Sequence, residues 1–346
     1  MKGRLEIDIK KEESTQKVLD KLPEFVSEWQ MNLKASGKTA STRYDYAYKI
    51  KNFIGFINSK APKEVTLEDI TFNVVQKFII SIQTKKDKDG NLVETSDSYR
   101  CTYWAMLRNF FDYLLGRKLI SEDPMGTIKC PKNRDLDRIN KHRSLLTSDD
   151  FKDILNAVDK DKDNIFHSMY ESKYNFELRE RNKFLLMLLM TTGMRETALT
   201  EINVEDVDVH AAKIIIVDKG QKEHIYDLSE EVNSQLGMWL VCRQEILDGI
   251  KKESDALFIS IYGERIGVNT VKRVVTKYSE AGLGYKISPH KLRSGYASIL
   301  YSKSHDIEYV RKAIGHSDVA TTQRYIVTEG NEKKTAADMI AKAIFD

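Results

Sequence analysis

The side chains best suited to chemistry lie near the end of the chain, in residues 288–326. His290 and Arg293 are three residues apart, so a helix would present an imidazole and a guanidinium on one face. His316 follows further along, and Tyr325 comes nine residues after it. Arginine binds phosphate oxygens through two N–H groups, histidine transfers protons, and a tyrosine oxygen can act as a nucleophile. This combination predicts phosphodiester chemistry that needs no metal ion.

Helices are expected to position these groups. Ser288-Pro289 provides an N-cap and a first helical residue. A second helix is predicted from about residue 306, with Gly315 as its C-cap. The turn after that glycine holds His316, and a further short helix would carry Tyr325.

Two segments upstream add to this set. The first is T-T-G-M-R at residues 191–195, which follows the apolar run at residues 184–190. The second is a predicted β-hairpin whose strands are residues 214–217 and 223–228, with Lys219 in the turn. A β-branched run, a turn and a returning run are typical of an antiparallel pair.

Taken one at a time, these residues have structural explanations: His290 could be an interior histidine and Tyr325 a packing residue. Together the segments resemble the tyrosine recombinase (phage integrase) family, in which T-G-x-R, a hairpin lysine, H-x-x-R, G-H and a tyrosine follow in this order. The similarity covers nearly all of residues 20–330. It implies a DNA-cleaving enzyme that needs no cofactor.

The resemblance implies a role for each principal residue. Arg195 and Arg293 would hold the scissile phosphate, and His316 would donate to one of its non-bridging oxygens. Tyr325 would attack the phosphorus and form a 3′-phosphotyrosyl intermediate, which stores the bond energy for rejoining. Because a free phenol has a pKa of about 10, His290 would assist as its base or proton relay.

Two of these assignments have alternatives. Lys219 would protonate the departing 5′ oxygen, and Lys222 on the same hairpin is its competitor. Tyr301 and Tyr309 are alternative nucleophiles, disfavoured because both precede the G-H element and fit helix packing.

One position departs from the family pattern. Members usually carry an acidic residue three positions after the first arginine, where this chain has Ala198. Glu196 follows Arg195 directly, but on a helix it would point about 200° away from residue 198. Glu196 is therefore not an obvious substitute for that carboxylate.

The composition fits a two-domain protein. The 346 residues suffice for two cores, and the net charge of +3 is small. Residues 1–145 hold 27 Lys and Arg against 20 Asp and Glu, whereas the rest holds 28 against 32. An excess of positive charge in the first part suits phosphate contacts, although a solvated surface would look the same.

The cysteines and the hydropathy of the chain limit the classes of protein to which it can belong. Cys101, Cys130 and Cys242 are odd in number, widely spaced and without metal-ligand spacing, which argues against a disulfide framework or a zinc site. The longest apolar run is too short for a membrane span, and the charged N-terminus does not look like a signal peptide. We expect no membrane association and a cytoplasmic protein.

The N-terminal half is predicted to be helical. Residues 1–20 are expected to form a short arm. Residues 21–117 should form an all-α, four-helix domain of the SAM-like, core-binding kind. Its helices are expected to begin near residue 22, at Ser41 and at the capping-box-like residues 66–69, and a fourth helix that carries Tyr99 should follow residues 85–94. Residues 85–94 are read as a turn. In the resembled family such a domain clamps one side of the duplex.

Residues 118–146 are predicted to be a basic interdomain linker, either a solvated tether or a segment that crosses the DNA backbone. Its candidate DNA-binding residues are Lys129, Lys132, Arg134, Arg138, Lys141 and Arg143.

Residues 147–330 should form a mainly helical catalytic domain with a small antiparallel sheet. Thr147 is a helix cap, further helices are expected at about 177–190, 230–250 and 268–281, and residues 257–259 are read as a short strand. The charged insertion at residues 159–177 has no evident purpose. A C-terminal helix in residues 331–346 is expected, exchanged with a neighbouring subunit or packed on its own domain.

Two acidic loops superficially resemble calcium sites. Residues 159–170 lack the loop glycine and the final glutamate of an EF-hand, and residues 87–91 are better read as a turn. No metal is expected at either place.

The resemblance implies duplex DNA recombination sites as partners and a homo-tetramer on DNA, with DNA-bending or directionality factors as further candidates. It implies bacterial, phage or mobile-element origin and association with the nucleoid. Rival functions are a type IB topoisomerase and a catalytically silent DNA-binding protein, the latter supported only by Ala198. Sequence specificity in DNA recognition depends on contacts with base edges and on DNA deformability, not on these motifs.

Overall fold

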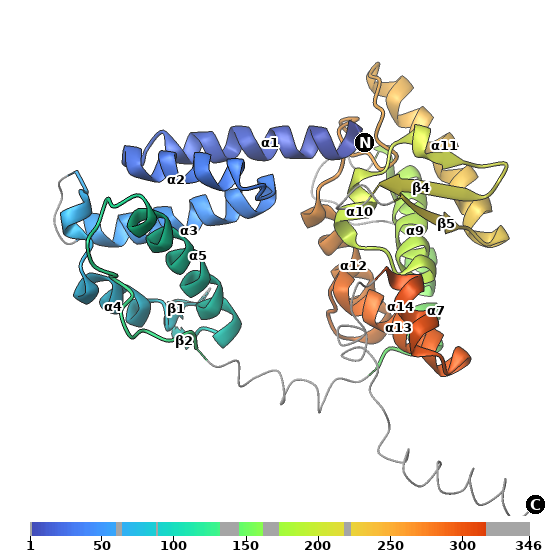
Figure 1. Cartoon of the computed structure of the whole chain (residues 1–346). Coiled ribbons are helices and arrows are strands. Elements are labelled where there is room, and N and C mark those ends of the chain that lie inside the picture. The colour runs from blue at the N-terminus through green and yellow to red at the C-terminus, as the bar shows by residue number, and fades with distance from the viewer. Residues whose placement is uncertain are drawn as a thin grey trace, which may run out of the picture. The chain divides into compact units, whose positions relative to one another are not determined.

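The computed structural model describes residues 2–59, 64–87, 89–131, 145–161, 173–217 and 223–315. The chain divides into two compact units, Leu5–His142 and Arg143–Asp346, the latter joined by Met1–Arg4 (Figure 1). The described chain is mostly helical with two small antiparallel sheets, which confirms the predicted mainly helical, two-domain fold class for the chain as a whole. The division falls inside the segment that was expected to be a linker.

The first unit is built on an aromatic core. Its helices are α1 (Lys2–Leu19), α2 (Glu24–Ala35), α3 (Ala40–Asn58), α4 (Phe72–Ser81) and α5 (Asp97–Gly116). Trp29, Phe53, Phe110 and Phe111 are fully buried among them, and the Trp29 and Phe110 rings meet edge to face. Burial of such large rings makes a large favourable contribution to the folding of this unit.

The expected N-terminal arm is instead helix α1, a correction to the sequence analysis. Val18 and Leu19 join the aromatic core, and Thr15 is buried. The carboxylate of Glu12 accepts two hydrogen bonds from the Arg43 guanidinium on α3. The helix was missed because only a few residues of a mostly charged sequence make contacts with the core.

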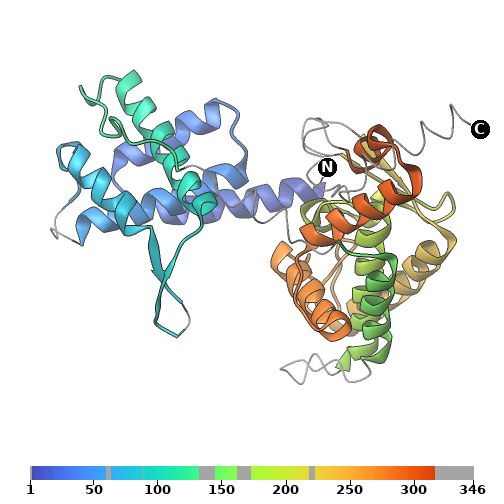
Figure 2. The same ribbon diagram turned by 90° about the horizontal axis from the view of Figure 1, so that it is seen from below.

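The all-α prediction for this unit also needs correction, because residues 85–94 are not a simple turn. Strands β1 (Thr84–Lys86) and β2 (Leu92–Glu94) pair antiparallel and form a projecting hairpin (Figure 2). Asp87 reverses the chain, since its carboxylate accepts the N–H groups of Asp89 and Asn91. Both strands are largely exposed, so no hydrophobic alternation marks them.

Two helix starts differ from prediction. Thr39, not Ser41, caps α3 by accepting the N–H of Thr42. The capping box of Thr66 and Asp69 encloses the short 3₁₀ helix η1 (Leu67–Asp69), and α4 begins only after Thr71. Both errors come from neighbouring Ser and Thr residues that satisfy the same capping pattern.

The second unit is arranged around the buried helix α9 (Asn175–Thr192), against which α7 (Ser148–Lys160), α11 (Glu230–Ile250) and α13 (Pro289–Ser304) pack (Figure 1). Its remaining elements are α10 (Glu196–Glu201), η2 (Val204–Asp206), β3 (Val207–Asp208), β4 (Lys213–Val217), β5 (Glu223–Asp227), α12 (Val268–Leu283) and α14 (Ile307–Ile314).

The sheet of this unit has the order β3-β4-β5, all antiparallel. The predicted hairpin strands β4 and β5 are paired, with Ile216 opposite His224 and Ile214 opposite Tyr226. Strand β3 was not predicted. The strand expected at residues 257–259 is wrong, since Ala256 and Ile259 form only isolated bridges.

Candidate active site

Helix α13 carries the first half of the candidate site. It begins at Pro289, and the Ser288 hydroxyl accepts the N–H of Lys291 at 3.3 Å, which confirms the predicted helix start. The buried side chains of Leu292 and Ala297 pack the helix against its neighbours α9, α12 and α14. The orientation of α13 is therefore set by the core of the unit.

Arg293 joins two separate motifs. Its side chain is only 4% exposed. Nη1 donates to the Gly193 carbonyl and Nη2 to the Ile314 carbonyl, both at 2.5 Å. The guanidinium therefore ties together the T-G-M-R turn and the end of α14, which directly precedes the G-H dipeptide. Charge-assisted hydrogen bonds of this kind are among the strongest in proteins.

The T-G-M-R turn has a defined shape. Gly193 ends α9 in the left-handed region, with φ of +61°, and the Thr192 hydroxyl accepts the N–H of Met194 at 3.3 Å. Met194 is buried in the core, whereas the next residue, Arg195, is exposed at the N-terminus of α10. The buried Met194 therefore fixes the position from which the Arg195 side chain extends into solvent.

Tyr296, one turn beyond Arg293, packs on this glycine. A Cβ atom at residue 193 would lie 2.3 Å from Cδ1 of the tyrosine ring, so only glycine fits there. Burial raises the pKa of Tyr296, and Tyr309 adds to this rise while Arg293 opposes it. Tyr296 is therefore a protonated packing residue at neutral pH.

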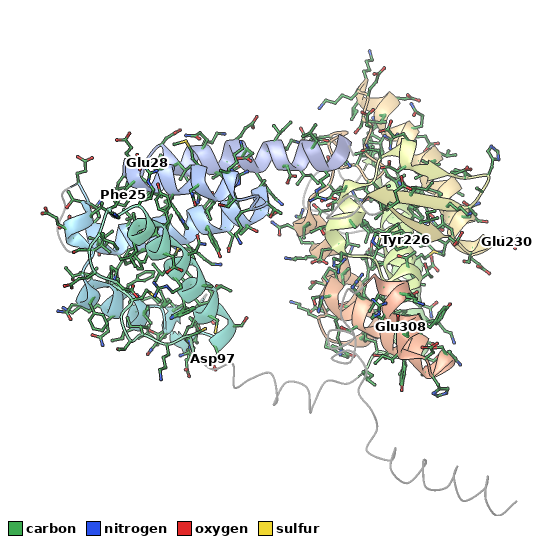
Figure 3. The ribbon with its side chains drawn as sticks, viewed as in Figure 1. Phe25, Glu28, Asp97, Tyr226, Glu230 and Glu308 are labelled. Atoms are coloured by element: carbon green, nitrogen blue, oxygen red, sulfur yellow. The ribbon has the colours of Figure 1, made fainter. Side chains whose placement is uncertain are left out.

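The end of α14 meets the sheet. Gly315 terminates the helix with φ of +66°, as predicted for a C-cap glycine. A Cβ atom there would lie 2.9 Å from Cε1 of His224, so the imidazole ring of β5 rests against this glycine. His224 and Tyr226 face the same side of β5, and Figure 3 labels Tyr226 on this strand.

His224 is a residue of this site to which the sequence analysis gave no role. The signal was present in the alternation of β5, because a histidine two residues from a half-buried tyrosine occupies the same strand face. What it contacts could not be read, since Gly315 is 91 residues away.

His290 is exposed in the first turn of α13. The alternative that it is an interior histidine is therefore wrong. Arg195 is also exposed, whereas Arg293 is buried. The structure thus brings together Gly193, Arg293 and Ile314-Gly315, with His290 on the same helix as Arg293.

Lys219, His316 and Tyr325 lie outside the described residues, as does the competing Lys222. Of the alternative nucleophiles, Tyr301 packs with Ala297, Val310 and Ile314. Tyr309 is 54% exposed on α14, so its expected packing role is wrong.

The position of the missing family carboxylate is apolar. Ala198 on α10 is partly buried against the main core of the unit, where its methyl group packs with hydrophobic side chains. Glu196, in the first turn of the same helix, is partly exposed.

Among the candidate DNA-binding residues, Lys129 is exposed at the end of the described part of the first unit. Those outside the described residues are Lys132, Arg134, Arg138, Lys141 and Arg143. The expected C-terminal helix in residues 331–346 and most of the 159–177 insertion lie outside them too.

Within the described ranges, no group of three His, Cys, Asp or Glu side chains is placed to hold a metal ion. None of the helices that the structure describes is long and apolar enough to cross a membrane.

Comparison with known proteins places these motifs in a family. Residues 144–332 match the family model described as the phage integrase family. The tyrosine recombinase XerC of Listeria welshimeri is 27% identical over 299 residues, covering 86% of this chain and 90% of the relative. The tyrosine recombinase XerD of Oceanobacillus iheyensis is 27% identical over 290 residues, covering 84% of this chain and 88% of the relative.

Solved structures share the fold. The XerH site-specific recombinase in its post-cleavage complex with a palindromic difH substrate superposes with a TM-score of 0.59 at 21% identity, covering 86% of this chain and 78% of that chain. A lambda integrase (75–356) dimer bound to a COC′ core site superposes with a TM-score of 0.57 at 16% identity, covering 89% of this chain and 96% of that chain.

The match of residues 144–332 to the family model shows that the chain belongs to the phage integrase family, the tyrosine recombinases. It is an enzyme of the site-specific DNA recombinase type.

Proposed function

We propose that this recombinase cuts and rejoins duplex DNA through a 3′-phosphotyrosyl intermediate on Tyr325. Arg195 and Arg293 hold the scissile phosphate, and His316 donates to a non-bridging oxygen as negative charge grows. His290 takes the phenol proton, directly or by relay. The covalent phosphodiester conserves the energy of the broken bond until a DNA hydroxyl displaces the tyrosine.

Lys219 completes the proposed chemistry as the acid that protonates the 5′ oxygen as it leaves. A lysine suits this step because its ammonium group carries a transferable proton, whereas an arginine holds its proton too tightly. The residues proposed need neither a metal nor ATP.

The observation that best supports this mechanism is the double hydrogen bond from Arg293 to Gly193 and Ile314. These hydrogen bonds hold the turn at Gly193, two residues before Arg195, close to the end of α14, two residues before His316 in the sequence. A guanidinium has five N–H donors, so one arginine can organise the backbone and still present N–H groups to a phosphate. Exposed His290, one turn earlier on α13, supports a role at the surface where DNA would lie.

We further propose integration or excision of a mobile element as the biological role, performed in the bacterial cytoplasm on the nucleoid. The DNA-bound relatives support duplex recombination sites as the partner, and a solved lambda integrase tetramer on a Holliday junction supports a tetramer. Lys129 and the basic residues after it would contact the DNA backbone, which supplies affinity without sequence information. Bending or directionality factors are further candidate partners.

The deciding experiment traps the covalent intermediate. Nicked duplexes that span the junctions of the element carrying the gene are mixed with wild type, Tyr325→Phe or Tyr309→Phe, and protein–DNA adducts are separated in SDS. Wild type and Tyr309→Phe should both form the adduct, because residue 309 is an exposed tyrosine without a proposed role. Tyr325→Phe should lower the yield at least about a thousandfold, since the nucleophile is absent.

Other outcomes contradict this assignment. An adduct that persists in Tyr325→Phe but disappears in Tyr309→Phe would move the nucleophile to α14. Adduct formation with relaxation of supercoiled DNA, but no exchange between two sites, would favour a type IB topoisomerase. Tight DNA binding without any adduct would favour a silent DNA-binding protein.

A further inference from the structure

The chain segment after α5 returns along that helix, held by side chains on one face. The Arg108 Nη1 atom lies 2.7 Å from Oδ2 of Asp123, and Trp104 Nε1 donates to the Ile128 carbonyl at 2.9 Å. One turn nearer the helix start, the Cys101 thiol donates to the Pro131 carbonyl at 3.1 Å. Residues 101, 104 and 108 follow helical spacing, so the segment runs antiparallel to α5 as far as residue 131.

The last contact of this series brings two cysteines together. The Cys130 thiol donates to the Cys101 sulfur across 3.2 Å, although 29 residues separate them. Cys130 is exposed and Cys101 is half-buried, whereas Cys242 is buried in the other unit. Because the two cysteines are widely spaced in the sequence, this pair exists only in the tertiary structure. Disulfide sulfurs lie about 2.05 Å apart, so closing the pair needs a movement of about 1.2 Å.

We propose that Cys101 and Cys130 form a reversible disulfide by exchange with low-molecular-weight disulfides of the glutathione type. The bond joins α5 to residue 130 and fixes this end of the returning segment against the helix. In the reduced protein this contact rests on thiol hydrogen bonds, which are weak. Oxidation replaces them with a covalent bond.

The exchange balances in two steps. The thiolate of one cysteine attacks a sulfur of the small disulfide, forms a mixed disulfide and releases one small thiolate. The second cysteine, after losing its proton, attacks the protein sulfur of that mixed disulfide and releases the second thiolate. The two protons from the cysteines end on the two released thiols, and the small disulfide is the oxidant that is reduced.

The environment of Cys130 sets the pH dependence of this exchange. Partial burial of its sulfur and the hydrogen bond to Cys101 raise the pKa of Cys130 to about 11. At neutral pH the group is therefore a thiol, and only the thiolate reacts. If its deprotonation limits closure, the rate should rise about tenfold per pH unit between pH 7 and pH 9.

The test uses the full-length protein with oxidised glutathione at pH 8, followed by peptide mass mapping and amide hydrogen exchange. A Cys101–Cys130 cross-linked peptide is expected, with Cys242 still reduced. Amide exchange at residues 127–130 should slow at least about tenfold on oxidation and recover with dithiothreitol. Cys242→Ser, the matched control, should behave like wild type.

Cys130→Ser replaces an exposed side chain, so it should fold normally and show neither the cross-link nor the slowed exchange. Two results would overturn the proposal. One is stable glutathione adducts on Cys101 or Cys130 without ring closure. The other is ring closure that leaves amide exchange at residues 127–130 unchanged, because the bond would then not fix the returning segment against α5.

Discussion

At the residue scale, Arg293 has a structural task in addition to its proposed contact with phosphate. Its buried guanidinium uses two N–H groups on carbonyls from segments that are 121 residues apart in the sequence, at Gly193 and Ile314. A planar, rigid fork can reach both carbonyls at once, and a lysine ammonium on a flexible stem cannot hold the same geometry. Loss of this residue should therefore change both stability and cleavage.

We predict that Arg293→Lys lowers the free energy of unfolding by about 2 kcal/mol, because at least one buried carbonyl loses a charge-assisted partner. Adduct formation on nicked DNA should fall at least about a hundredfold, since both the phosphate contact and the backbone geometry suffer. Urea unfolding and single-turnover adduct kinetics measure the two effects separately.

Arg195→Lys is the matched control. Its side chain is exposed at the start of α10, so stability should change by less than about 0.5 kcal/mol. Adduct formation should still fall, because the fork that would bind the phosphate is lost. Equal loss of stability in the two variants would contradict the organising role of Arg293.

At the scale of elements, the segment after α5 depends on an ion pair at Asp123. Partial burial alone would raise the pKa of this carboxyl group, but the hydrogen bond from Arg108 and the backbone N–H of Met125 outweigh it and hold the pKa below its usual value. A lowered folded pKa means that the stabilisation is present above the unfolded pKa of about 3.9 and is lost as the pH falls through the folded pKa.

We predict that Asp123→Asn destabilises the first unit at pH 7 and that its difference from wild type shrinks as the pH falls below about 4. Wild type should lose stability over that range because its carboxylate becomes protonated, whereas the amide does not titrate there. Urea unfolding at a series of pH values measures the difference. Glu122→Gln, at an exposed neighbouring position, is the control. A difference that stays constant down to pH 3 would contradict the ion-pair explanation.

At the scale of the whole molecule, each unit has a separate hydrophobic core. One contains the rings of Trp29, Phe53 and Phe110, and the other surrounds α9 with Phe184 and Trp239. No residue belongs to both of these clusters in the described chain. Each unit is therefore expected to fold by itself.

We predict that fragments 1–142 and 143–346 each unfold in one cooperative transition when produced separately. Thermal melts followed by circular dichroism should show two transitions that together account for the helical signal of the full chain. The fragment with residues 143–346 should retain the Arg293 contacts, because Gly193 and Ile314 lie within it. A broad, non-cooperative melt of either fragment would show that its core is incomplete.

The sequence by itself determined the features that depend on neighbouring residues. The N-cap at Ser288, the first helical residue Pro289 and the C-cap at Gly315 were predicted because capping uses side chains and φ values within one helical turn. The order of the motifs was enough to indicate the family, because each motif carries a residue type with a particular role in phosphoryl transfer.

Only the tertiary structure decided the contacts between distant segments. The tie from Arg293 to Gly193 and Ile314, the ring of His224 against Gly315 and the thiol pair at residues 101 and 130 each join residues at least 21 positions apart. Helix α1 and the β1–β2 hairpin were missed because sparse contacts and short exposed strands leave no periodic hydrophobic pattern. Local rules describe where an element begins and ends, whereas packing of several elements into one core determines which side chains meet.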